Sequence, residues 1–250
     1  MSNRLETGIR VVLVGTTHPG NIGAAARAMK TMGLQDLALV QPKVYPSAEA
    51  TVRAAGADNI LVDAPVCETL EEGLAGCGLV VGTSARRRSI AWPVLTPEEC
   101  ARKMLEFNGK AAVVFGREHS GLTNVELEQC HYMVQISTNP DFASLNVASA
   151  VQVLAYELRK QWESMTPDEI VATQRREEPP ADAAHLHDFY LNLEKTLAML
   201  DYAPHRSSRL MRRLHRLFNR AAPTETEINL LHGILAAARD VASKADGENS

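Results

Sequence analysis

The sequence predicts an α/β fold in which a mostly parallel sheet is sandwiched by helices, with a small all-α extension at the C-terminal end. Short apolar runs rich in β-branched residues alternate with helical patterns between residues 9 and 160. The runs lack polar alternation, which is typical of strands buried on both faces of a parallel sheet. The alternation ends after Trp162, and helical patterns follow. Strand–helix alternation of this kind typically forms an α/β sandwich.

Five of the apolar runs are expected to be strands, and helices between them have readable starts. The strands are expected at residues 9–15, 36–41, 79–84, 111–116 and 132–137. Thr96 and Thr123 each open a T-x-x-E pattern, which predicts a capping box at the start of a helix. Pro97 suits the first helical position, so a helix is expected to begin there.

The last third of the chain has a different composition. Residues 163–184 are polar, contain proline and hold few large apolar side chains, so we predict a linker there. It separates a domain at residues 1–162 from a helical extension at residues 185–250. Leucines at helical spacing predict three helices in the extension, at residues 185–201, 206–221 and 224–243. Thr224 opens the third with another capping box, and residues 244–250 are expected to be disordered.

The composition excludes several classes of protein. The formal net charge of −4 over 250 residues argues against indiscriminate nucleic-acid binding, so an anionic partner must meet a local basic patch. Two such patches occur, at residues 86–88 and 205–220. No apolar run reaches the roughly 18–20 residues of a membrane span, and the first residues lack the apolar region of a secretory signal. We therefore expect a cytoplasmic protein without a membrane partner.

Cysteine and histidine spacing gives no sign of a metal. The four cysteines lie far apart without a C-x-x-C pair, and the eight histidines form no H-E-x-x-H or comparable ligand pair. We expect neither a disulfide framework nor a metal site.

A glycine-rich loop follows the first expected strand. Its glycines are Gly15, Gly20 and Gly23, whereas a dinucleotide fingerprint needs G-x-G-x-x-G. A Walker A loop needs Lys after its second glycine, and here Asn21 follows Gly20, so a Rossmann dehydrogenase and a P-loop NTPase are both disfavoured. The N–H groups of the loop and of the helix N-terminus still suit an anion. Arg27, one turn beyond Gly23, either faces that loop or is a surface arginine of an Ala-rich helix.

Two later segments place polar residues after buried strands. Glu118 follows a strand directly, where α/β sheets usually place ligand contacts, although a polar loop after a strand is common. Ser144 and Asn146 flank the entry to a helix that is apolar on nearly every side. A helix cap explains Ser or Asn at such a position equally well.

Taken together, these segments resemble the three motifs of the SpoU branch of the SPOUT RNA 2′-O-methyltransferases. The matching stretches read "HPGNIGAAARAMKTMG", "VVFGREHSGLT" and "SLNVASAVQVLAYE". The resemblance covers roughly residues 9–160. The "GTSAR" turn, the "FGREHSGLTN" loop and the helices after a polar linker look closer still to the bacterial tRNA (cytidine/uridine-2′-O)-methyltransferases that act on nucleotide thirty-two of the anticodon loop.

The resemblance implies a deep trefoil knot, S-adenosyl-L-methionine as cofactor, tRNA as partner, and a homodimer with active sites at its interface. Periodicity cannot indicate a knot, because knots are among the rarest topologies. Carried over by motif position, the implied catalytic residues are Asn21, Arg27, Glu118, Ser144 and Asn146. The implied cofactor-binding residues are Thr83, Ser84, Ala85, Gly116, Ile136, Ser144, Leu145 and Asn146.

The reaction that the resemblance implies is an attack of a ribose 2′-oxygen on the sulfonium methyl group. Arg27 matches the arginine that acts on the ribose hydroxyl. A guanidinium with a pKa above about 12 is a poor base, so we expect Arg27 to stabilise the developing alkoxide instead. The sulfonium is already activated, and no metal is required.

Two arginine groups are expected to hold RNA phosphates. One follows the "GTSA" turn at the sheet edge where the cofactor is expected, and the other lies on an amphipathic helix of the extension. The expected RNA-binding residues are Arg86, Arg87, Arg88, Arg209, Arg212, Arg213 and Arg216. The first group is otherwise a solvated surface run, and a basic amphipathic helix also suits a membrane surface or a protein partner.

Two other functions stay open. A 2′-O-methyltransferase of the same branch that acts on ribosomal RNA, or on another tRNA position, would share the three motifs. A non-catalytic RNA-binding factor with the same fold is the other, and the intact set of polar motif residues argues against it.

Overall fold

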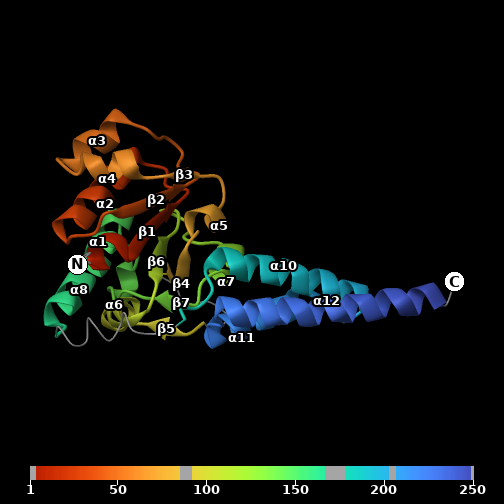
Figure 1. Ribbon diagram of the computed structural model, residues 1–250. Coiled ribbons are helices and arrows are strands. Elements are labelled where there is room, and N and C mark those ends of the chain that lie inside the picture. Colours follow the sequence, from red (N-terminus) through yellow and green to blue (C-terminus); the bar gives the residue numbers. More distant parts are fainter. Residues whose placement is uncertain (1–3, 85–91, 167–177, 203–206, 249–250) are drawn as a thin grey trace.

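The computed structural model describes residues 4–84, 92–166, 178–202 and 207–248. A sheet with helices on both faces forms the larger part of the molecule (Figure 1). Helices α10, α11 and α12 project from one end of it, and α12 reaches farthest and carries the C-terminal end. The predicted fold class, an α/β sandwich with an all-α extension, is confirmed.

The sheet has seven strands in the order β3-β2-β1-β6-β4-β7-β5, and every neighbouring pair is parallel. The strands are β1 (Ile9–Val14), β2 (Asp36–Val40), β3 (Val66–Cys67), β4 (Cys77–Thr83), β5 (Val94–Leu95), β6 (Lys110–Phe115) and β7 (Tyr132–Val134). All five predicted strands are present. The two edge strands β3 and β5 were not predicted, because two residues are too few to produce a pattern.

Residues of the central strands alternate between two apolar cores. In β1, Val11 and Leu13 belong to one core, and Val12 and Val14 to the other. Both faces are therefore apolar, which explains the unbroken runs in the sequence. The first core is covered by α2 (Pro19–Thr31), α3 (Ala48–Ala54), α4 (Asp58–Asp63), α6 (Pro97–Glu106) and α8 (Val147–Ser164). The second is covered by α5 (Leu70–Gly73) and α7 (Asn124–Glu128), and α1 (Arg4–Thr7) precedes β1.

All three predicted capping boxes form. The hydroxyls of Thr96 and Thr123 accept from the N–H groups of Glu99 and Glu126, and both glutamates return the bond. At Thr224, the hydroxyl accepts from the Glu227 N–H at 3.3 Å, and the Glu227 carboxylate accepts from the Thr224 N–H at 2.8 Å.

The extension consists of α10 (Ala183–Met199), α11 (Ser207–Ala221) and α12 (Glu225–Glu248), which share a third apolar core. Pro180 and Thr224, which precede α10 and α12, pair with each other, and α10 contacts α5 and β4 of the sheet domain. The expectation of disorder was wrong for residues 244–248, because extending an existing helix needs no new nucleation.

The four cysteines are buried free thiols. Within the described ranges, no helix is both long enough and apolar enough to cross a membrane. The trefoil knot implied by the resemblance stays a prediction.

Candidate active site

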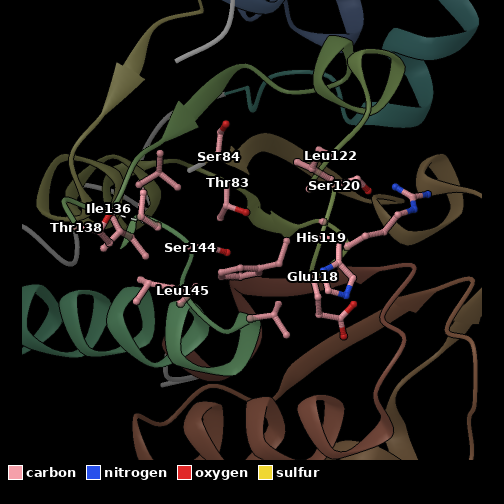
Figure 2. Close-up of a pocket in the computed structure, with 18 of the residues that line it drawn as sticks. Thr83, Ser84, Glu118, His119, Ser120, Leu122, Ile136, Thr138, Ser144 and Leu145 are labelled. Atoms are coloured by element: carbon pink, nitrogen blue, oxygen red, sulfur yellow. Dashed lines mark hydrogen bonds between the residues drawn. The ribbon is translucent and has the colours of Figure 1, made fainter. Parts of the chain in front are cut away.

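A cavity of about 400 Å³ opens beyond the carboxyl ends of β4, β6 and β7. Three loops form it: the end of β4, the loop after β6, and the segment between β7 and α8. Figure 2 shows Ile136 and Thr138 at one end, Glu118 and His119 at the other, and Ser144 between them. Six of the residues predicted to bind a cofactor line this cavity, namely Thr83, Ser84, Gly116, Ile136, Ser144 and Leu145. Ala85 lies outside the described residues.

The loop after β6 folds back on itself at Gly116. A Cβ atom at this position would lie 2.2 Å from the carbonyl carbon of Gly121 and 2.3 Å from the N atom of Leu122. Gly121 donates its N–H to the Arg117 carbonyl at 2.9 Å and has a positive φ of 68°. Both glycines are therefore required by this turn, one for close approach and the other for its backbone angle.

The neighbouring loops are also tied to the sheet. The Thr83 hydroxyl donates to the Val114 carbonyl at 3.0 Å, and the Ser84 N–H donates to the Val134 carbonyl at 3.2 Å. Phe115, Leu122 and Val134 are buried and give the cavity an apolar base. Backbone groups and apolar side chains therefore make up most of its walls.

Glu118 connects the second motif with the first. Its carboxylate accepts from the N–H and the hydroxyl of Thr17 at 3.0–3.1 Å, from the His18 N–H at 3.3 Å, and from Asn21 Nδ2 at 3.0 Å. These donors surround the start of α2, where the helix dipole also favours a negative charge. Glu118 therefore orders the loop that leads into α2.

The hydrogen bonds determine the charge of Glu118. Partial burial alone would raise its pKa, but donors from Asn21, the Glu118 backbone, Thr17 and His18 lower the pKa to about 2. The carboxylate is thus ionised at neutral pH and has its lone pairs engaged. It suits a positioning role better than the transfer of a proton.

Asn146 is both a helix cap and a member of this network. Its Oδ1 accepts from the N–H groups of Ala148 at 2.9 Å and Ser149 at 3.4 Å, which caps α8. Its Nδ2 donates to Asn21 Oδ1 at 2.9 Å. The structure thus joins one residue from each motif in the chain Glu118–Asn21–Asn146. Ser144 is exposed and lines the cavity.

Arg27 lies apart from this group within the chain. It is an exposed residue of α2, and among the described residues it makes no hydrogen bond or ion pair and does not line the cavity. Six residues along a helix turn the side chain by about 120° relative to Asn21, which explains why only Asn21 reaches Glu118.

The predicted RNA-binding arginines fall into two groups. Arg86, Arg87 and Arg88 lie outside the described residues. On α11, Arg209, Arg213 and Arg216 are exposed, whereas Nε of Arg212 lies 3.7 Å from the Glu128 carboxylate.

Some residues of the site were not predicted from the sequence. Thr17 contacts Glu118 across 101 positions, and no local pattern marks such a pair. Arg117 forms two 3.0 Å hydrogen bonds with the Glu126 carboxylate and so ties the cavity loop to α7. Its position directly before Glu118 in a charged loop was the available signal.

Comparison with known proteins identifies both parts of the chain. The model of the SpoU rRNA Methylase family matches residues 8–156, and that of the tRNA methyltransferase TrmJ C-terminal domain matches residues 184–248. A tRNA (cytidine/uridine/adenosine-2′-O-)-methyltransferase TrmJ from Pseudomonas aeruginosa is 49% identical, over 94% of this chain and 95% of the relative. A tRNA (cytidine/uridine-2′-O-)-methyltransferase TrmJ from Klebsiella pneumoniae is 48% identical, over 92% and 95% respectively.

A solved structure extends the similarity to three dimensions. TrmJ from Z. mobilis ZM4 superimposes with a TM-score of 0.80 at 34% identity, covering 91% of this chain and 97% of that one. The chain therefore belongs to the SpoU methylase family, and within it to the group that carries the TrmJ C-terminal domain.

Proposed function

We propose that this chain transfers a methyl group from S-adenosyl-L-methionine to the ribose 2′-oxygen of nucleotide thirty-two in the anticodon loop of tRNA. Cytidine and uridine are the proposed target nucleotides. The observation that carries the proposal is the cavity lined by Glu118, which is hydrogen-bonded to Asn21 of the first motif and, through Asn21, connected to Asn146 of the third. Relatives of about half identical sequence are named as tRNA 2′-O-methyltransferases, which supports the substrate class.

The residues of the cavity fit the proposed cofactor. Its volume of about 400 Å³ lies within the range typical of small-molecule sites. Ile136 and Leu145 offer apolar surface to a flat base, and Phe142 at the mouth is 81% exposed, as expected for a side chain that a ligand covers. The ionised carboxylate of Glu118 lines the cavity, and a negative charge there would suit a cofactor with a cationic sulfonium. When bound, the cofactor supplies an electrophilic methyl group.

In this proposal, each motif residue helps to position the reacting groups. Glu118 holds Asn21 and the start of α2, and Asn146 holds Asn21 from the other side. Ser144 lines the cavity between the loops, and we assign it to the methionine end of the cofactor. These contacts reduce the freedom of the reacting groups, which is a major source of rate enhancement.

Arg27 is proposed to hold the 2′-oxygen and an adjacent phosphate through its two-pronged guanidinium, which a lysine cannot imitate. It stabilises the developing alkoxide without accepting the proton. Its exposed place outside the cavity of its own chain fits the proposed homodimer, in which active sites lie at the interface between subunits.

Methyl transfer from tritiated S-adenosyl-L-methionine tests this function. We expect labelling of an unmodified tRNA transcript and none of a ribosomal RNA fragment of similar length. Labelling of the ribosomal fragment alone would indicate a 2′-O-methyltransferase of the same branch that acts on ribosomal RNA. Labelling of neither RNA would favour a non-catalytic RNA-binding factor.

The role of Arg27 is tested with a matched pair of variants. Arg27→Lys is expected to lower methyl transfer at least a hundredfold while leaving the melting temperature unchanged, because the side chain is exposed. Arg53→Lys, at another exposed arginine on the neighbouring α3, is expected to keep normal activity. Near-normal transfer by Arg27→Lys would refute the two-pronged contact.

A further inference from the structure

A second cavity, of about 300 Å³, lies between α11 and the sheet domain. Trp92, Pro93, Cys130 and His131 line it from the sheet domain, and α11 contributes Arg213, Arg216, Leu217, Asn219 and Arg220. It shares no described lining residue with the first cavity. His131 directly precedes β7, whereas Ile136 of the first cavity follows this strand. Five residues of extended chain separate the two sites by roughly 16 Å.

Three arginines give this second cavity a strongly positive wall. Arg213, Arg216 and Arg220 recur at intervals of three and four residues, which places them on one face of α11. All three are exposed, and among the described residues none of them forms an ion pair. The described residues that line the cavity include no carboxylate. Like charges gathered in this way destabilise a helix face unless an anion neutralises them.

His131 adds a buried donor to the same cavity. Its side chain is mostly enclosed, since the residue is 8% exposed, and its Nδ1 accepts from the Val80 N–H of β4 at 3.1 Å. Burial lowers the pKa of His131 to about 4, so the ring is neutral at pH 7 and its one proton is on Nε2. That Nε2–H is buried and has no hydrogen-bond partner among the described residues. Buried donors of this kind are rare and call for a ligand.

The other polar groups of the cavity are already engaged. Trp92 donates its ring N–H to the Cys130 carbonyl at 3.3 Å, and Asn219 Oδ1 accepts from the Tyr190 hydroxyl at 2.7 Å. The groups left to meet a ligand are therefore the three guanidinium groups and the His131 Nε2–H. All are donors, and an oxyanion is the partner that satisfies donors alone.

We propose that the second cavity binds a phosphate group of the tRNA backbone, held by Arg213, Arg216 and Arg220 and by the buried His131 Nε2–H. The inference rests on the proposed function, because that function supplies the RNA. Charge on an exposed helix attracts RNA without orienting it, whereas a phosphate held between α11 and the sheet domain sets the register of the RNA. The site therefore positions the target nucleotide for the first cavity, a few nucleotides away.

Measuring tRNA affinity of the full-length protein at several salt concentrations distinguishes a specific phosphate site from non-specific electrostatic attraction of RNA. Arg216→Gln is expected to weaken tRNA binding about tenfold at about 0.1 M salt and to reduce the slope of log affinity against log salt by about one. Lys195→Gln removes an exposed cation of the neighbouring α10 that does not line the cavity, and we expect at most a threefold effect. Unchanged melting temperatures confirm that both variants fold. Equal losses in the two variants would overturn the proposal.

The His131 imidazole provides a second test. Its Nε2 resonance shifts when a ligand accepts the Nε2–H, whereas the resonance of a residue that only supports the fold would stay unchanged. In protein labelled with ¹⁵N-histidine, the Nε2 resonance of His131, assigned by its loss in His131→Gln, is expected to shift when tRNA is added. Arg216→Gln should suppress this shift. A resonance that moves with inorganic phosphate and not with tRNA would overturn the assignment to RNA. Wild-type protein that binds and methylates tRNA with this resonance unmoved would refute the inference alone, whereas absence of binding and methylation would refute the proposed function.

Discussion

Replacing Glu118 by glutamine tests whether this residue positions the site or transfers a proton. The carboxylate accepts hydrogen bonds from Thr17, His18 and Asn21, and these lower its pKa to about 2 from the ordinary value of 4.5. Glutamine keeps one acceptor oxygen but loses the charge, and its amide N–H groups meet other donors.

The expected loss of stability follows from the pKa. One pKa unit corresponds to about 1.4 kcal/mol, so the shift is equivalent to at most about 3.5 kcal/mol, and exposure to water reduces this to roughly 1–2 kcal/mol. Because the folded pKa is lowered, the stabilisation is complete above pH 4.5 and disappears as the pH falls towards 2. The difference in unfolding free energy between wild type and Glu118→Gln should therefore be largest at neutral pH and vanish in acid.

Urea unfolding between pH 2 and 7 measures this difference. Glu98→Gln, at an exposed glutamate in the first turn of α6, is the control and should change the unfolding free energy by less than about 0.5 kcal/mol. A constant difference between wild type and Glu118→Gln at all pH values would contradict the assigned pKa.

The pH dependence of methyl transfer distinguishes the two roles of Glu118. We expect Glu118→Gln to reduce the rate constant kcat about ten- to a hundredfold through misplacement of Asn21, with the shape of the profile unchanged above pH 6. If the wild-type profile had an acid limb above pH 5 that the variant lacked, Glu118 would be a general base and the positioning role would be refuted.

Two further pairs of variants test the loops. Gly116→Ala places a Cβ against backbone atoms, so we expect calorimetry to show at least tenfold weaker cofactor binding, whereas Gly233→Ala meets nothing within 4 Å in α12 and should raise the melting temperature. Asn146→Ala should cost about 1 kcal/mol by urea unfolding through loss of the α8 cap, whereas Asn146→Asp keeps the cap and loses the donor to Asn21. Reduced methyl transfer without reduced stability is therefore expected for Asn146→Asp. Normal methyl transfer by this variant would refute a role for the Asn146–Asn21 hydrogen bond in activity.

Much of the fold was predictable because burial leaves a pattern. The central strands have helices on both faces, so both sets of alternating side chains are apolar, as Val11 and Val12 illustrate. Helix starts were readable because a capping box involves residues only three positions apart. The edge strands β3 and β5 are two residues long and carry no pattern of either kind.

The site was predictable where one segment carries the whole signal. Gly116 and Ser144 lie within motifs and line one cavity. Contacts between distant segments were not predictable from one sequence. Thr17 and Glu118 are 101 positions apart, and the His131 ring accepts its hydrogen bond from Val80, 51 positions away. Arg27 differs from both groups. The first motif predicts it as a site residue, but it does not line the cavity formed by its own chain.

The most direct measurement compares two tRNA transcripts that differ by one oxygen. One is unmodified, and the other carries a 2′-deoxyribose at nucleotide thirty-two; both are incubated with the protein and labelled S-adenosyl-L-methionine. We expect methyl transfer to the first transcript and none to the second. Equal labelling of both transcripts would contradict 2′-O-methylation at this nucleotide.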